Sequence, residues 1–100
     1  MTSSHEAAIQ WRRLRLALAR WRKEAGLSQR ESANAMGWSL SKLVRLENGD
    51  TRPIVADVLA LASYYGASVG EAQEFSDVAR SLPNKILENE DELRKVLGTS

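Results

Sequence analysis

Residues 28–49 read SQRESANAMGWSLSKLVRLENG, and this stretch predicts two short helices joined by a tight turn. Ser28 and Glu31 have the spacing of a capping box, in which the serine oxygen accepts a backbone N–H and the glutamate reaches back to the N–H of the cap. Gly37 tolerates the positive φ that ends a helix sharply, and Ser39 is a suitable N-cap for the helix that follows. The stretch therefore predicts a helix, a turn and a second helix.

The two predicted helices have a small and apolar inner side. Ala33 is small at a point where two helices would cross closely, and Leu43 and Leu46 are spaced three apart so that both face inward. This spacing leaves a second face of the later helix for contacts outside the chain. That face carries Leu40, Ser41, Lys42, Val44 and Arg45.

These residues carry a resemblance to a known family. The pattern resembles the Xre/Cro-type, or lambda-repressor-like, helix-turn-helix DNA-binding family over roughly residues 14–66, and its variant Gly-Trp-Ser, Ser-Lys and Arg-Leu-Glu-Asn-Gly is similar to a group of actinobacterial regulators. The resemblance implies an all-α domain of five helices, whose third helix enters the major groove of double-stranded DNA, in a homodimer. The matching residues are Gln29, Ala33, Gly37, Leu43, Leu46 and Glu47-Asn48-Gly49, preceded by Arg22 and Ala25-Gly26-Leu27.

The outward residues of the second helix are the candidate base contacts. Arg45 has the reach for a bidentate contact with guanine O6 and N7, and Ser41 can contact a base edge. Leu40 and Val44 are apolar, whereas members of the similar group commonly carry polar residues there. Two interpretations are open for this apolar pair: contact with thymine methyl groups, or contact with another protein.

A second set of residues is predicted to contact the DNA backbone. The resemblance implies that Gln29, at the N-terminus of the first helix of the pair, meets a phosphate, as helix N-termini do well. Arg30 is adjacent, and Arg52 lies in the loop after the second helix. The full set of predicted phosphate contacts is Gln29, Arg30, Lys42, Asn48 and Arg52.

The resemblance also implies one structural ion pair, between Arg22 and Glu47. This pair would link the first helix to the end of the recognition helix. Because removal of one partner would leave an unmatched buried charge, its role is interpreted as structural.

The formal net charge is only +1, but the charges are unevenly distributed along the chain. Residues 1–56 contain ten Lys or Arg against five Asp or Glu, or +5, and residues 57–100 contain four against eight, or −4. Such asymmetry is typical of a molecule that presents a basic face to phosphates and an acidic end away from them. Chance segregation of solvated charges is the alternative explanation.

Before the central stretch, residues 6–25 contain Leu14, Leu18 and Trp21 at helical spacing and predict a long first helix. Trp21 is assigned to the core, whereas Trp11 is expected to be exposed as a dimer or partner contact. The other side of this helix is basic, which fits either a solvated surface or contact with DNA or an acidic partner. Its basic residues are Arg12, Arg13, Arg15, Arg20 and Lys23.

After the central stretch, helices are predicted at 54–65 and 69–82. Val55, Val58, Leu59 and Ala62 recur with helical period in the first, and Ser68 with Glu71 gives the second a capping box. Tyr64 and Tyr65 are assigned to the edge of the core. A sixth helix is a candidate at 84–97.

The predicted organisation is a flexible segment at 1–8, a helix-turn-helix domain at 9–82, and a C-terminal helix, linker or oligomerisation segment at 83–100. Ser3 and Glu6 also have capping-box spacing, which could start a helix near the N-terminus.

Several function classes find no support in the sequence. Cysteine is absent, the single His5 has no ligand cluster near it, and no catalytic constellation or cofactor motif is present. We therefore expect no enzyme activity, metal or cofactor, and a cytoplasmic location. The leading hypothesis is a sequence-specific DNA-binding transcriptional regulator of repressor type; the alternative is a protein-interaction module on the same fold, such as an antitoxin or regulatory adaptor, using Leu40, Val44 and Trp11.

Overall fold

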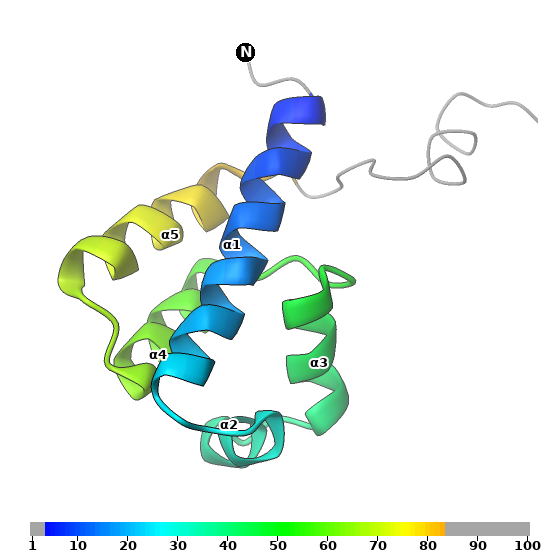
Figure 1. The fold of residues 1–100 in the computed structure, drawn as a ribbon. Helices are drawn as coiled ribbons and strands as arrows, with labels where there is room; N and C mark the ends of the chain where they lie inside the picture. The colour runs from blue at the N-terminus through cyan, green and yellow to red at the C-terminus, as the bar shows by residue number, and fades with distance from the viewer. Residues whose placement is uncertain (1–3, 84–100) are drawn as a thin grey trace, which may run out of the picture.

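The computed structural model describes residues 4–83, which form five helices and contain no strand. In Figure 1, α1 runs through the middle of the molecule, with α4 and α5 on one side, α3 on the other, and α2 across the lower end. Helix α1 contacts α3, α4 and α5, and further contacts join α2 to α3 and α4 to α5. The helices are α1 (Ser4–Glu24), α2 (Gln29–Met36), α3 (Leu40–Asn48), α4 (Val55–Tyr65) and α5 (Val69–Ser81).

Helix α1 is the central element because its buried stripe reaches three other helices. Trp11, Leu14, Leu18 and Trp21 follow spacings of three, four and three residues, and all four are buried. The prediction that Trp21 belongs to the core is confirmed. The prediction that Trp11 is exposed is wrong: it continues the same stripe, and only 8% of its surface is accessible.

The N-terminal boundary also differs from the prediction. Helix α1 begins at Ser4, so residues 4–8 are helical although the sequence placed them in a flexible segment. Ala7 extends the buried stripe by one turn and packs into the core. This contact gives the first turns of α1 a tertiary anchor, which polar composition alone did not reveal. Ser3, the proposed cap, and the candidate helix at 84–97 lie outside the described residues.

The remaining core comes from the inner faces of α3, α4 and α5. Leu59 is exposed, and Leu61 occupies the inward position of α4 instead. Tyr65 is buried and Tyr64 is exposed, so only Tyr65 belongs to the core that the sequence assigned to both tyrosines. The buried apolar residues of these helices and the segment after α5 are Leu43, Leu46, Val58, Leu61, Ala62, Tyr65, Phe75, Ala79 and Leu82.

The turn after α2 depends on the backbone freedom of Gly37. This residue has φ of 73°, and its N–H donates to Asn34 O at 3.1 Å, while the next N–H donates to Ala33 O at 2.9 Å. These bonds satisfy the last carbonyls of α2 and turn the chain toward α3. Gly70, by contrast, lies within α5 and is not among the glycines with positive φ.

Substitution by alanine should change the free energy of unfolding in opposite directions at these two glycines. Gly37→Ala should lower the free energy of unfolding by about 1 kcal/mol, because alanine is strained at positive φ even though a Cβ added there would meet no atom within 4 Å. Gly70→Ala should raise it by about 0.5 kcal/mol, since alanine loses less backbone entropy in a helix. Urea unfolding of both variants measures the difference, and a shift of the same sign in both would contradict this account.

Candidate nucleic-acid interface

Helices α2 and α3 form a compact unit on the side of the molecule away from α5 (Figure 1). Capping fixes both helix starts: Glu31 N–H donates to Ser28 Oγ at 3.0 Å, and Lys42 N–H donates to Ser39 Oγ at 3.1 Å. Glu31 Oε1 also accepts the N–H of Ser28 at 2.9 Å, and these bonds lower the pKa of the Glu31 carboxyl. The predicted capping box is confirmed, and it sets where α2 begins.

The outward face of α3 gathers the four residues that the sequence assigned to base contacts. They border a shallow hollow of about 270 Å³. Ser41 and Arg45 are exposed, while Leu40 and Val44 are half-buried. Because residues four apart are neighbours on a helix surface, the four side chains form an apolar row, Leu40 and Val44, beside a polar row, Ser41 and Arg45.

Arg45 differs from most arginines of the chain in having no internal partner. Within residues 4–83 no hydrogen bond or ion pair involves its guanidinium, whereas Arg13, Arg20 and Arg22 each pair with a glutamate. An exposed guanidinium without a partner has all five donors free for an external acceptor. Arg30, exposed in the first turn of α2, also has no partner among the described residues.

Lys42 is more constrained than the sequence suggested. Its Nζ lies 3.5 Å from Asp57 Oδ1 on α4 and 4.1 Å from the ring centroid of Trp38. The ammonium group therefore joins α3 to α4 and rests on an aromatic face. A phosphate at this position would compete with Asp57 for the same cation.

Gln29 and Arg52 are likewise engaged inside the protein. Gln29 Nε2 donates to Glu47 Oε1 at 3.0 Å, so the amide of Gln29 is occupied by the buried carboxylate. Arg52 Nη1 donates to Leu82 O at 3.1 Å and so holds the loop after α3 to the end of α5. Of the five predicted phosphate contacts, Arg30 and Asn48 are exposed without a side-chain partner among the described residues, whereas the 39% exposed side chain of Lys42 pairs with Asp57.

Glu47 is the centre of the network that fixes α3. Arg22 Nε donates to Glu47 Oε2 at 2.7 Å, and Arg22 Nη2 donates to Glu47 Oε1 at 3.0 Å. A third bond runs from Arg22 Nη1 to Leu27 O at 3.0 Å. The side chains of Arg22 and Glu47 are only 12% and 6% exposed, and the hydrogen bond to Glu47 raises the pKa of Arg22. Arg22 and Glu47 thus form the pair that the resemblance implied.

Two of the five basic residues on the outer side of α1 are neutralised by glutamates of α5. Arg13 Nη2 lies 2.8 Å from Glu74 Oε2, and Arg20 pairs with Glu71 and lowers the pKa of that carboxyl. The acidic half of the sequence therefore folds against part of the basic half instead of pointing away from it. Arg30 on α2 and Arg45 on α3 are among the cations without a partner in the described residues. The α2–α3 unit can therefore attract an anion although the net charge of the whole molecule is close to zero.

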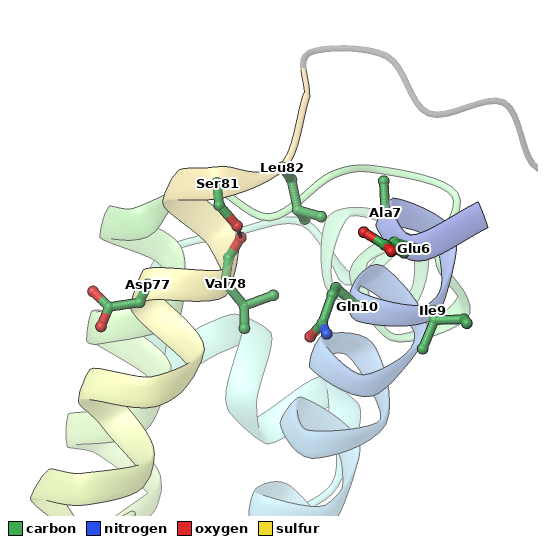
Figure 2. A pocket seen from close by; sticks show the side chains of 8 residues that line it. All are labelled: Glu6, Ala7, Ile9, Gln10, Asp77, Val78, Ser81 and Leu82. Carbon is green, nitrogen blue, oxygen red and sulfur yellow. Dashed lines mark hydrogen bonds between the residues drawn. The ribbon is translucent and has the colours of Figure 1, made fainter. Parts of the chain in front are cut away.

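A second hollow, of about 610 Å³, lies between the first turns of α1 and the end of α5. Figure 2 shows Gln10, Val78 and Leu82 toward the space between the two helices, with Ile9 and Asp77 at its outer edges.

Residues 4–83 contain no group of three acidic, histidine or cysteine side chains that could hold a metal ion. None of the helices in the same range is long and apolar enough to cross a membrane.

A family model described as a helix-turn-helix domain matches residues 13–75, which run from α1 into α5 and include α2, the turn and α3. No curated protein and no solved structure is significantly similar to the chain.

The network around Glu47 predicts a large loss of stability on removal of one partner. Arg22→Ala should lower the free energy of unfolding by about 3 to 5 kcal/mol, because it leaves the Glu47 carboxylate buried without its bidentate donor. Arg80→Ala is the control, since Arg80 and its partner Asp77 are 62% and 56% exposed and their pair contributes at most about 1 kcal/mol. Chemical unfolding measures both variants; equal losses would show that Arg22 and Glu47 contribute no more than a surface pair.

Proposed function

The chain belongs to the helix-turn-helix domain family, and on that premise we propose that it is a sequence-specific DNA-binding transcriptional regulator of the Xre/Cro type. In this proposal α3 lies in the major groove, which admits an α-helix and displays a distinct pattern of donors and acceptors for each base pair. The protein carries out no chemistry of its own and acts by occupying its binding site.

The observation that carries the proposal is the exposed guanidinium of Arg45 beside Ser41 on α3. Both side chains lie on the outward face, and Arg45 has no partner within the described residues. A planar fork of donors suits guanine O6 and N7, and a hydroxyl suits either a donor or an acceptor on a base edge. The Glu47 network supports this role, because it holds the helix that carries both groups.

Backbone contacts in the proposal come from the start of α2 and from the end of α3. Arg30 offers a free cation next to the N-terminus of α2, where backbone N–H groups and the helix dipole favour a phosphate. Asn48 is exposed at the end of α3. Gln29, Lys42 and Arg52 contribute mainly by fixing the fold, since each side chain already has an internal partner.

We further propose that two copies bind a pseudo-palindromic site. Two α3 helices would then lie about one turn of DNA apart, roughly 34 Å between half-site centres. Selection of bound duplexes from a random DNA pool tests this directly. Enrichment of an inverted repeat with that spacing supports a dimeric reader, whereas enrichment of a single half-site supports a monomeric one.

The alternative is a protein-interaction module that uses the apolar pair Leu40 and Val44. Their half-buried position on an outward helix face favours it, but Trp11, the third residue assigned to this role, lies in the core. Salt separates the two functions, because release of counterions makes DNA affinity fall steeply with salt and an apolar protein interface responds weakly. No enriched duplex, with binding lost by physiological salt, would favour the protein partner.

Substitution of Arg45 should reduce the sequence selectivity of DNA binding, whereas substitution of Arg30 should reduce its overall affinity. Arg45→Ala should reduce discrimination at one guanine by about 1 to 3 kcal/mol, since the bidentate contact is lost. Arg30→Ala should weaken binding to all duplexes alike and reduce the slope of log affinity against log salt by about 1. Gel shifts across a salt series measure both effects, with Arg80→Ala as a charge-matched control on α5; an Arg45→Ala variant with unchanged selectivity would remove Arg45 from base reading.

A further inference from the structure

The side chains that border the hollow on α3 match one chemical group in the major groove of DNA. Its walls are two aliphatic side chains, Leu40 and Val44, and two polar ones, Ser41 and Arg45. The major-groove edge of a base pair carries one apolar substituent, the 5-methyl group of thymine, and 5-methylcytosine carries the same group at the same position. From this match we infer that the hollow receives a pyrimidine 5-methyl group, an inference that rests on the proposed DNA-binding function.

The two rows of side chains determine how the contacts are arranged. Leu40 and Val44 are one helical turn apart, so a methyl group can lie between them and be shielded from water on both sides. Ser41 lies next to this row, where its hydroxyl can donate to O4 of thymine or accept from the amino group of a cytosine. The hollow therefore recognises a methyl group and a neighbouring polar atom of the same base.

Arg45 adds a guanine close to that pyrimidine. Ser41 and Arg45 are four residues apart, which is about 6 Å along the axis of α3. Successive base pairs are about 3.4 Å apart. If α3 follows the groove, Arg45 reaches a guanine within about two base pairs of the methylated pyrimidine, and the recognised element is a short pyrimidine–guanine combination.

The size and surroundings of the hollow favour a base over a protein side chain. The hollow is bordered by only four residues of one helix, whereas a typical protein interface involves about 20 to 30 residues on each partner. Asn48, an exposed polar residue, follows Val44 by one helical turn and so ends the apolar row. The free cations Arg30 and Arg45 complement a polyanion, and together these features select DNA as the occupant.

The test begins with the best duplex from the random pool. Each thymine in turn is replaced by deoxyuridine, which removes only the 5-methyl group, and affinity of the full chain is measured at fixed salt. One position in each half-site should weaken binding about fourfold, the factor for withdrawing one carbon from an apolar contact. If the selected base at that position is cytosine, 5-methylcytosine should strengthen binding by the same factor, which distinguishes the two sources of the methyl group.

Protein variants connect the methyl effect to the hollow. Val44→Thr keeps the shape of the side chain but replaces a methyl with a hydroxyl, so the ratio of affinities for thymine and deoxyuridine should fall toward one. Val69→Thr is the matched control, because Val69 is 87% exposed on α5 and should leave the ratio unchanged. Thermal unfolding of both variants checks that each remains folded.

The outcomes separate this inference from the function on which it rests. Failure to select any duplex would overturn the DNA-binding proposal itself. Specific binding that is indifferent to every deoxyuridine and 5-methylcytosine replacement would leave DNA binding intact and overturn the methyl inference. A methyl effect that persists in Val44→Thr would also overturn it, because the methyl group would then be recognised elsewhere.

Discussion

The carboxylate of Glu47 is the constraint on which the rest of the structure depends. It lies at the end of α3, is almost fully buried, and accepts from Arg22 of α1 and Gln29 of α2, so a single side chain joins three helices. Arg15 adds a bond from Nη1 to the backbone oxygen of Glu47 at 3.4 Å. A buried charge is tolerated only when its donors are in place, and this requirement permits one arrangement of α3 against α1 and α2. The outward face of α3 is oriented as a consequence.

The cations of the described residues fall into two groups, according to whether they have a partner inside the protein. Arg22 neutralises a buried carboxylate, and Arg13 and Arg20 pair with glutamates on α5, so these guanidinium groups hold helices together. Arg30 and Arg45 have no partner among residues 4–83 and remain available to an external anion. Net charge conceals this division, because a paired arginine and a free one count equally in it. The binding potential of a small domain depends on which cations are unpaired and where they lie.

The sequence was informative where local chemistry decides structure and less so where contacts cross the chain. Serine caps, left-handed glycines and the spacing of Leu14, Leu18 and Trp21 located the helices, since each acts within one or two turns. The partners of Lys42 and Arg52 depend on where α4 and the end of α5 come to lie, which no local pattern encodes. Trp11 lies in the core because it continues the stripe that Ala7 begins, and the interval of four residues between them is a signal that the sequence contains.

The proposed reading of DNA by α3 implies more than one copy of the chain. One good bidentate contact contributes about 1 to 3 kcal/mol of discrimination, and specific sites are typically bound about 4 to 10 kcal/mol more tightly than other DNA. A single α3 offers one free guanidinium, one hydroxyl and one apolar row on its outward face, which reaches at best the lower part of that range. Two copies on a two-fold site double the free energy of discrimination, because each copy contributes the same contacts. The small size of the candidate reading surface is therefore itself an argument for a symmetric dimer on DNA.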